Sequence, residues 1–224
     1  MEKHYRQRYA VELHNVYKSF GSDSILKGIT HRFERGCIHG IIGMNGSGKT
    51  VLLKCICGFL RPTKGHIVVN GQRVGKDTDF PPSIGLILET PGFLPNLSGF
   101  QNLYRLAKLN RQISATEVRK AMEAVGLDSS TKKAVKSYSL GMRERLGIAQ
   151  AIMEQPDLLV LDEPFNGLDK IGVKEVCHLL QTYKTKEKTI LLAAHNFAEL
   201  RMLCDTITEL DGGKIVNHER RASE

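Results

Sequence analysis

The chain has 224 residues, of which 41% are hydrophobic, so it is long enough to bury a complete core. No run reaches the roughly 18 to 20 apolar residues of a membrane-spanning helix, and no apolar segment behind the charged start resembles a signal peptide. The net charge of +8 is dispersed and fits phosphate ligands, nucleic acid or an anionic surface alike. The five cysteines are odd in number and lack metal-ligand spacing, which favours buried thiols over disulfides or a zinc site.

The first third of the chain alternates expected strands with one helix. The apolar run at 37–42 is a buried strand that stops at a glycine-rich turn, and residues 50–57 continue as a helix ending at Gly58. An Asn-Gly pair at 70–71 favours a type I′ turn between two short strands. Further strands in this part are expected at 11–16, 66–69, 72–74 and 84–88. Residues 24–30 are expected to form a turn that leads into another strand.

The middle of the chain is predicted to be helical. A first helix covers 100–108, a second follows the capping box Ser114 to Glu117, and a third begins after Ser139 and ends before Pro156. The apolar residues expected on the buried faces of these helices are Leu103, Leu106 and Ala107, then Val118, Ala121, Met122 and Val125, then Leu146, Ala149, Ile152 and Met153.

The last third returns to alternating strands and helices. Strands are expected at 157–162 and 189–194, helices at 170–183 and after Asn196, and a closing hairpin at 206–216. The buried helix faces carry Val173, Val176, Cys177 and Leu180, then Phe197, Leu200 and Leu203. Strands separated by helices imply an α/β fold with a parallel sheet, in which the helical block is an insertion. We expect one domain over 1–224, with an α/β core at 1–90 and 156–224 and a helical subdomain at 91–155.

The segment Gly43 to Thr50 matches the phosphate-binding pattern G-x-x-x-x-G-K-[ST] in full. It follows a predicted strand and opens a predicted helix, so consecutive backbone N–H groups and the helix N-terminus face an anion. Lys49 supplies a cation to the β- and γ-phosphates, and the Thr50 hydroxyl is a ligand for Mg²⁺. The expected nucleotide-binding residues here are Gly43, Met44, Asn45, Gly46, Ser47, Gly48, Lys49, Thr50 and Val51.

Two carboxylates, Asp162 and Glu163, follow the apolar strand that begins at residue 157. Ligands of open parallel sheets sit at the carboxyl ends of strands, so Asp162 is expected near Thr50 and the metal. Glu163 points elsewhere and is placed to accept a proton from an attacking water. His195 ends another strand and reaches the same edge, where it contacts the γ-phosphate or braces Glu163. Glu163, His195 and Lys49 are the predicted catalytic residues.

The segment from Tyr138 to Ile152, written YSLGMRERLGIAQAI, resembles the signature segment of ABC ATPases. Residues 162–169, DEPFNGLD, resemble the family's Walker B motif and D-loop, and His195 is similar to its switch histidine. Phe20 is similar to the aromatic residue that stacks on adenine. These motifs follow the family's order over nearly the whole chain. The resemblance implies a P-loop NTPase fold in which a mixed sheet with a parallel core is joined by an N-terminal antiparallel part and a helical insertion.

The resemblance implies that two such domains sandwich two molecules of ATP with Mg²⁺. Ser139, Gly141 and Asp169 would contribute to a nucleotide held by the phosphate loop of the second copy. The partners would be that second ATPase domain and a membrane-spanning subunit on a separate chain, received by the segment 89–100. No direct contact with nucleic acid is expected. The expected location is the cytoplasmic face of the cell membrane, reached through the partner.

Three residues depart from the family pattern. Leu140 replaces the usual Gly of the signature, Met142 the usual Gln, and Glu89 the Gln that typically follows the strand at 84–88. Glu89 is a predicted metal ligand beside Thr50 and Asp162, but it adds a negative charge near the phosphates. The segments 84–93, 97–103 and 138–142 resemble those of the ATPases of bacterial bacitracin and lantibiotic resistance exporters.

Two alternatives stay open at this point. A soluble ABC ATPase acting on nucleic acid or ribosomes usually carries two such domains or long coiled coils, and this chain has neither sustained heptads nor a second domain. A non-catalytic module that closes on ATP without hydrolysis is disfavoured by Glu163, since the expected base is present.

Overall fold

An antiparallel sheet forms one side of the molecule. The computed structural model describes residues 8–89, 92–110 and 113–221. In this sheet β2 (Asp23–Glu34), β1 (Tyr9–Phe20), β4 (Lys64–Val69) and β5 (Gln72–Arg73) lie in that order. β1 is longer than the predicted 11–16 because β2 pairs with its whole length and β4 with its other edge. Both residues of the Asn70-Gly71 turn have positive φ, as the predicted type I′ turn requires.

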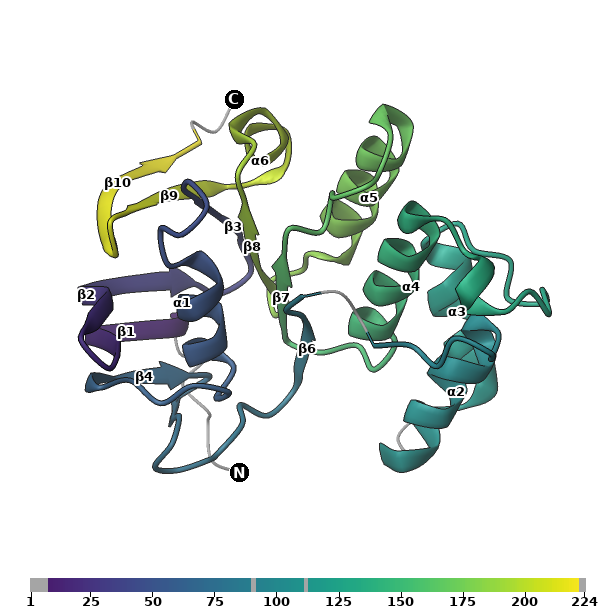
Figure 1. The fold of residues 1–224 in the computed structure, drawn as a ribbon, viewed down its shortest axis with the longest axis horizontal. Coiled ribbons are helices and arrows are strands. Elements are labelled where there is room, and N and C mark those ends of the chain that lie inside the picture. The colour runs from purple at the N-terminus through teal and green to yellow at the C-terminus, as the bar shows by residue number, and fades with distance from the viewer. Residues whose placement is uncertain (1–7, 90–91, 111–112, 222–224) are drawn as a thin grey trace.

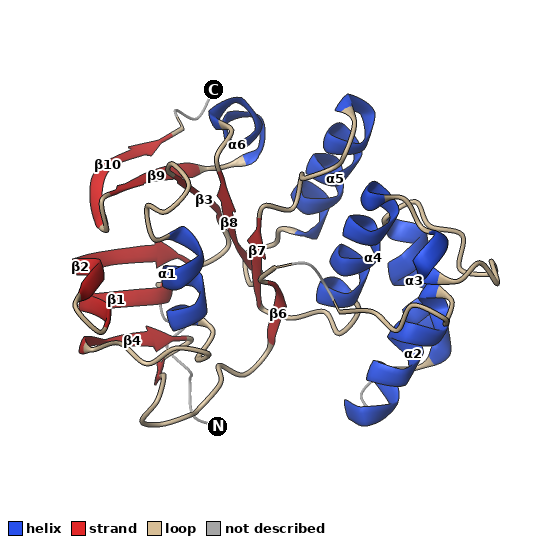
Figure 2. Cartoon of the chain, viewed as in Figure 1, coloured by secondary structure: helices blue, strands red, loops and turns tan. Residues whose placement is uncertain are grey.

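A second, mixed sheet of six strands forms the centre of the molecule (Figures 1 and 2). Its order is β10 (Lys214–Arg220), β9 (Thr206–Asp211), β3 (Ile38–Ile42), β8 (Thr189–Ala194), β7 (Leu158–Asp162) and β6 (Ile84–Ile87). The pairs from β9 to β6 are parallel, and only β10 runs antiparallel to its neighbour. The parallel core therefore brings the carboxyl ends of β3, β8, β7 and β6 to one edge.

The helices divide into those that cover the sheets and those that form a separate block. α1 (Lys49–Ile56) packs against β2, β4 and β7, between the two sheets. α5 (Lys170–Tyr183) and α6 (Phe197–Leu203) flank the central sheet, while α2 (Gly99–Asn110), α3 (Ala115–Ala124) and α4 (Leu140–Ile152) gather on the far side of β6 (Figure 1). A single 3₁₀ turn (Val135–Ser137) precedes α4. This arrangement confirms the predicted α/β class with an antiparallel part and a helical insertion.

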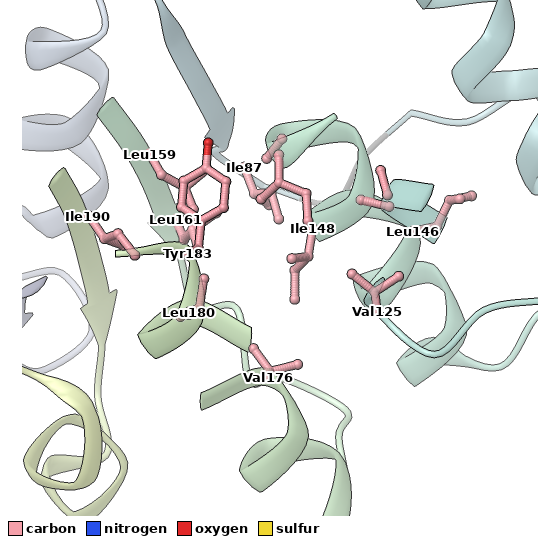
Figure 3. Close-up of a cluster of buried hydrophobic side chains, with 14 of the residues drawn as sticks. Ile87, Val125, Leu146, Ile148, Leu159, Leu161, Val176, Leu180, Tyr183 and Ile190 are labelled. Carbon is pink, nitrogen blue, oxygen red and sulfur yellow. The ribbon is translucent and has the colours of Figure 1, made fainter. Parts of the chain in front are cut away.

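Two hydrophobic cores lie on opposite faces of the central sheet. β7 serves both, because alternate side chains of a strand point to opposite faces: Leu159 and Leu161 join one core, Leu158 and Val160 the other. The first core, between the sheet and helices α4 and α5, is shown in Figure 3. The second lies between α1 and the antiparallel sheet. The predicted helix faces are buried or partly buried except at Leu106 and Phe197, each 38% exposed at the rim of its face.

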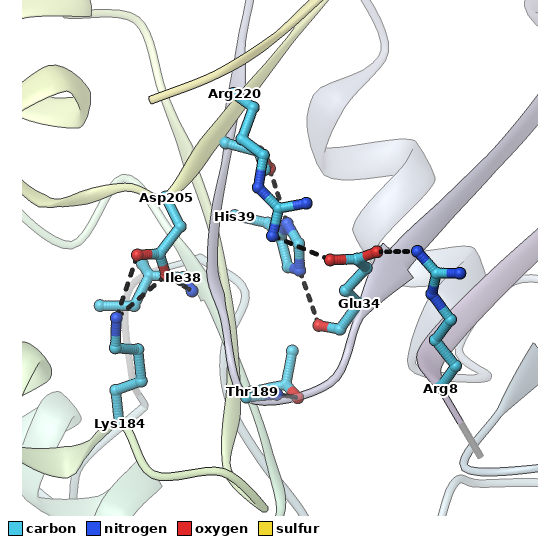
Figure 4. Close-up of polar contacts among 10 residues, drawn as sticks. Arg8, Glu34, Ile38, His39, Lys184, Thr189, Asp205 and Arg220 are labelled. Carbon is cyan, nitrogen blue, oxygen red and sulfur yellow. Dashed lines mark hydrogen bonds and ion pairs between the residues drawn. The ribbon is translucent and has the colours of Figure 1, made fainter. Parts of the chain in front are cut away.

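Polar contacts join the two sheets near the termini (Figure 4). The Glu34 carboxylate accepts hydrogen bonds from Arg8 and Arg220, both at 2.9 Å, which ties β2 to β10. The backbone carbonyl of Glu34 lies 2.8 Å from His39 Nε2. Burial lowers the pKa of His39, so the imidazole is neutral at neutral pH.

All five cysteines are free thiols, as predicted. Cys55, Cys57, Cys177 and Cys204 are buried, and Cys37 is half-buried. Burial raises the pKa of Cys55 and Cys177 to about 11 and that of Cys57 to about 12. Within the described residues, no helix combines the length and apolar character needed to cross a membrane.

Candidate functional site

The loop 43–48 connects the end of β3 to the start of α1. Its first glycine is required by close packing, because a Cβ at Gly43 would lie 2.2 Å from the Leu210 carbonyl oxygen. Gly48, directly before the helix, has φ +107°, a conformation that residues with side chains rarely adopt. The sequence therefore folds into a tight loop whose backbone N–H groups precede a helix N-terminus, which is the geometry of a phosphate site.

Lys49, the first residue of α1, is 6% exposed. Its ammonium group donates to the backbone carbonyl oxygens of Gly43 at 2.7 Å and Met44 at 3.3 Å. Lys49 thus links the end of the loop to its start and holds a positive charge beside Gly43 and Met44. That charge lies where the pattern predicts contact with the terminal phosphates.

The register of the parallel strands brings the predicted acidic residues to the same edge. Ile42 pairs with Ala194, and Ala193 pairs with Asp162, so β3, β8 and β7 end side by side. The Thr50 hydroxyl donates to Asp162 Oδ2 at 2.5 Å, across 112 residues of sequence. Burial raises the pKa of Asp162, and neighbouring Glu163 raises it further, against the hydrogen bond from Thr50 and the charges of Lys49 and Lys54.

Glu163 turns away from Asp162 and contacts two other site residues. Its Oε2 lies 2.8 Å from His195 Nδ1, and its Oε1 lies 3.9 Å from Lys49 Nζ. The backbone N–H of Glu163 donates to the Ala193 carbonyl at 2.8 Å, and its φ is +52°. Of the two roles predicted for His195, the structure places the ring against Glu163. The carboxylate is therefore held between a cation and an imidazole at the edge of the sheet.

Two buried polar atoms of the site have no hydrogen-bond partner among the described residues. They are Ser47 Oγ in the loop and Asp162 Oδ1. Burying an unpartnered polar atom is costly, so these atoms fit a ligand that supplies partners. Thr50 and Asp162 offer hard oxygen ligands, which suit Mg²⁺. The described residues contain no group of three His, Cys, Asp or Glu side chains able to hold a metal by themselves. This donor set matches a Mg²⁺ ion that is also bound by phosphates and water.

Phe20 and Glu89 occupy the borders of this site. Phe20 ends β1 and is 48% exposed, with Lys18 Nζ 4.9 Å from its ring centroid. The following strand packs its residue Leu26 against Gly48 of the loop, so the exposed ring belongs to the same hairpin. Glu89 follows β6, and its carboxylate forms an ion pair with Lys54 of α1. Sequence reasoning missed Lys54, although its place four residues after Thr50 puts both on one helix face.

The predicted signature residues lie at the start of α4. The Ser139 hydroxyl caps this helix by accepting a hydrogen bond from the Met142 N–H at 3.2 Å. The side chain of Leu140 lies against Gly167: a Cβ on that glycine would come within 2.4 Å of it. Asp169 caps α5 through the Gly172 N–H at 2.8 Å. The signature therefore contacts the D-loop of its own chain. Among the described residues, no hydrogen bond or ion pair joins Ser139 to the phosphate loop.

Comparison with known proteins places the chain in a family. The profile of the family described as "ABC transporter" matches residues 26–166. An uncharacterized ABC transporter ATP-binding protein of Bacillus subtilis, YybJ, is 39% identical over 94% of this chain and 96% of its own length. The bacitracin transport ATP-binding protein BcrA of Enterococcus faecalis is 39% identical over 93% of this chain and 68% of its own. The lantibiotic transport ATP-binding protein SrtF of Streptococcus pyogenes is 34% identical over 92% of this chain and 89% of its own.

A solved structure supports the same assignment. A solved structure of the ATP binding subunit of an ABC transporter superposes with a TM-score of 0.83 and is 26% identical, over 94% of this chain and 90% of that one. The match extends over both sheets and the helical block, as the coverage requires. The chain belongs to the ABC transporter family and is one of its ATP-binding ATPase domains.

Proposed function

We propose that this chain is the ATP-binding and ATP-hydrolysing subunit that energises a separate membrane-spanning subunit of an ABC transporter. One observation carries the proposal. Lys49, Glu163 and His195 form a connected group at the edge where the Thr50–Asp162 pair also lies. A cation for phosphates, a carboxylate for water and an oxygen pair for Mg²⁺ therefore meet at the end of a phosphate-binding loop.

Glu163 is the proposed general base. The oxygen of a water molecule attacks the γ-phosphorus, the bond from that phosphorus to the β–γ bridging oxygen breaks, and the water proton passes to the Glu163 carboxylate. His195, on the other carboxylate oxygen, fixes the orientation of the base. Lys49 holds the phosphates, and the hydroxyl of Thr50 with the carboxylate of Asp162 would hold Mg²⁺. The ion supplies charge neutralisation on the phosphate oxygens when bound.

The second half of the site is proposed to come from another copy. Ser139 and Leu140 are exposed at the start of α4, where a hydroxyl and backbone N–H groups are apt donors to a γ-phosphate. The Leu140 side chain lies against Gly167 of its own chain, and the Ser139 hydroxyl accepts from the Met142 N–H, yet both residues stay exposed. Two copies in a nucleotide sandwich would join each signature, with Gly141, to the phosphate loop of the other.

The membrane partner is proposed to dock where the sheet meets the helical block. Leu94 is half exposed there, and its backbone is fixed on both sides by the buried Asn102 amide, which accepts from the Leu94 N–H at 2.7 Å and donates to its carbonyl at 3.2 Å. A rigid, exposed apolar loop suits a protein partner. The domain would lie on the cytoplasmic face of the membrane through this contact. Its relatives include transport ATPases for bacitracin and a lantibiotic, which favours export of a peptide antibiotic as the transport reaction.

The test uses Glu163→Gln beside the wild type and a control, Glu219→Gln, on the outer strand β10. We expect the wild type and the control to hydrolyse ATP, and Glu163→Gln to lose about 10²- to 10⁴-fold in turnover. Size-exclusion chromatography should show Glu163→Gln as a dimer with Mg²⁺-ATP and a monomer without nucleotide. Normal turnover in Glu163→Gln would contradict the base assignment. A monomer with ATP would contradict the sandwich.

A further inference from the structure

Glu89 leaves the central sheet at the same edge as the acidic pair, although 73 residues separate it from Asp162. β6 pairs in parallel with β7, and Ile87 is opposite Leu161. Glu89 stands two residues after Ile87, as Glu163 stands two residues after Leu161, so both carboxylates follow the same edge of the sheet. Glu89 also has φ +92°, a conformation that a residue with a side chain rarely adopts. The backbone is thus turned sharply where this carboxylate enters the site.

Lys54 connects Glu89 to the metal-binding residues. It lies one helical turn after Thr50 on α1, and its ammonium group pairs with Glu89 Oε1. Thr50, on the same face of α1, donates to Asp162. This one helix face therefore contacts both Glu89 and Asp162, through Lys54 and Thr50.

Among the carboxylates and lysines of the site, Lys54 reduces the excess of negative charge from two to one. Glu89, Asp162 and Glu163 contribute three carboxylates at this edge, and Lys49 alone faces them from the phosphate loop. ATP brings further negative charge to the same place, which an uncompensated Glu89 would repel. A neutral Gln at position 89 would not create this problem.

We propose that Lys54 is a positioning residue of the ATPase site, which holds the Glu89 carboxylate and offsets its charge beside the triphosphate, so that Lys54 is required only while position 89 carries a carboxylate. The inference rests on the nucleotide site proposed above. The pair does little for folding, because the Lys54 and Glu89 side chains are 30% and 67% exposed and ion pairs in water are weak. Its effect is therefore expected in nucleotide binding and turnover, with the thermal midpoint unchanged.

A double-mutant cycle tests the proposal in the full chain. Lys54→Met should weaken binding of a fluorescent ATP analogue with Mg²⁺ about fivefold and raise KM in parallel, since a unit charge near the phosphates loses its counter-charge. Glu89→Gln alone should weaken binding less than Lys54→Met does, because it leaves no uncompensated carboxylate beside the phosphates. Lys54→Met with Glu89→Gln should return to within about twofold of the wild type. Lys120→Met, an exposed lysine on α3, is the matched control and should bind as the wild type does.

The outcomes separate the two claims. A double variant that binds as weakly as Lys54→Met, or whose two effects multiply, would overturn the pairing while leaving the nucleotide site intact. A Lys54→Met variant that binds and turns over normally would overturn it as well. A wild type that fails to bind Mg²⁺-ATP would instead overturn the proposed function. Thermal unfolding of each variant shows whether a loss of binding is a loss of fold.

Discussion

The phosphate loop and the signature segment differ in how far one chain completes them. Around the loop, Lys49 contacts Glu163, and Thr50 bonds Asp162, so residues from three strands and a helix meet within the chain. At the signature, the Ser139 hydroxyl bonds only the Met142 N–H among the described residues, and Leu140 is 50% exposed. The difference supports a nucleotide site formed within a single copy and a signature completed by a second copy, as proposed above.

The largest effect is expected from removing Lys49, the buried cation of the phosphate loop. Lys49→Ala should weaken binding of Mg²⁺-ATP at least about 100-fold, because the loop loses a buried charge that faces the phosphates and its bonds to two loop carbonyls. Equilibrium titration with a fluorescent ATP analogue measures the loss. Lys64→Ala, an exposed lysine on β4, is the control and should bind normally. Retained affinity in Lys49→Ala would show that the loop does not hold the terminal phosphates.

Ser139→Ala should separate the two regions. We expect turnover to fall about tenfold, as after loss of one hydrogen bond to the γ-phosphate in a closed site, while ATP binding by the isolated chain stays within about twofold. Ser114→Ala is a matched control, because Ser114 caps α3 in the same way and its loss should cost a similar ~1 kcal/mol of stability. Steady-state hydrolysis and thermal unfolding of both variants check this. Equal turnover in the two variants would show that Ser139 caps α4 and has no further role in hydrolysis.

The smallest effect is expected where the signature meets the D-loop. A Cβ at Gly167 would lie 2.4 Å from the Leu140 side chain, and this glycine has φ +72°. Gly167→Ala should therefore lower the free energy of unfolding by about 1 to 2 kcal/mol. Combining it with Leu140→Gly should remove the steric part and leave the backbone strain. Urea denaturation measures both, and additive losses would show that the two residues do not press on each other.

The sequence predicted the phosphate loop and acidic pair well because their chemistry is local. The local pattern of Gly43–Thr50 predicts a phosphate-binding loop, and two carboxylates after an apolar strand predict metal and water contacts. The parallel sheet then brings these residues together. The helix starts at Ser114 and Ser139 were equally readable, since a capping side chain acts within three residues of its own position.

Contacts that depend on the order of the strands in the sheet could not be predicted from the sequence. The Lys54–Glu89 pair requires that β6 be the edge strand next to β7, and no local pattern states which strands are neighbours. The contact of Leu140 with Gly167 joins two loops whose approach is set by helix packing. Leu106 and Phe197 carry helical spacing but lie at the rim of their faces, because the apolar stripe is wider than the surface that covers it.

The high pKa values of the buried thiols make the chain's own cysteines poorly reactive toward thiol-directed reagents. At pH 7 a thiol of pKa about 11 has roughly one thiolate in 10⁴ molecules, and one of pKa about 12 has roughly one in 10⁵. Alkylating reagents act on thiolates, so these cysteines react slowly even before burial blocks access. Only half-buried Cys37 would need replacement. A cysteine introduced at exposed Leu94 would then be the reactive thiol for cross-linking to the proposed membrane partner, so the low reactivity of the core thiols allows the outer surface to be mapped.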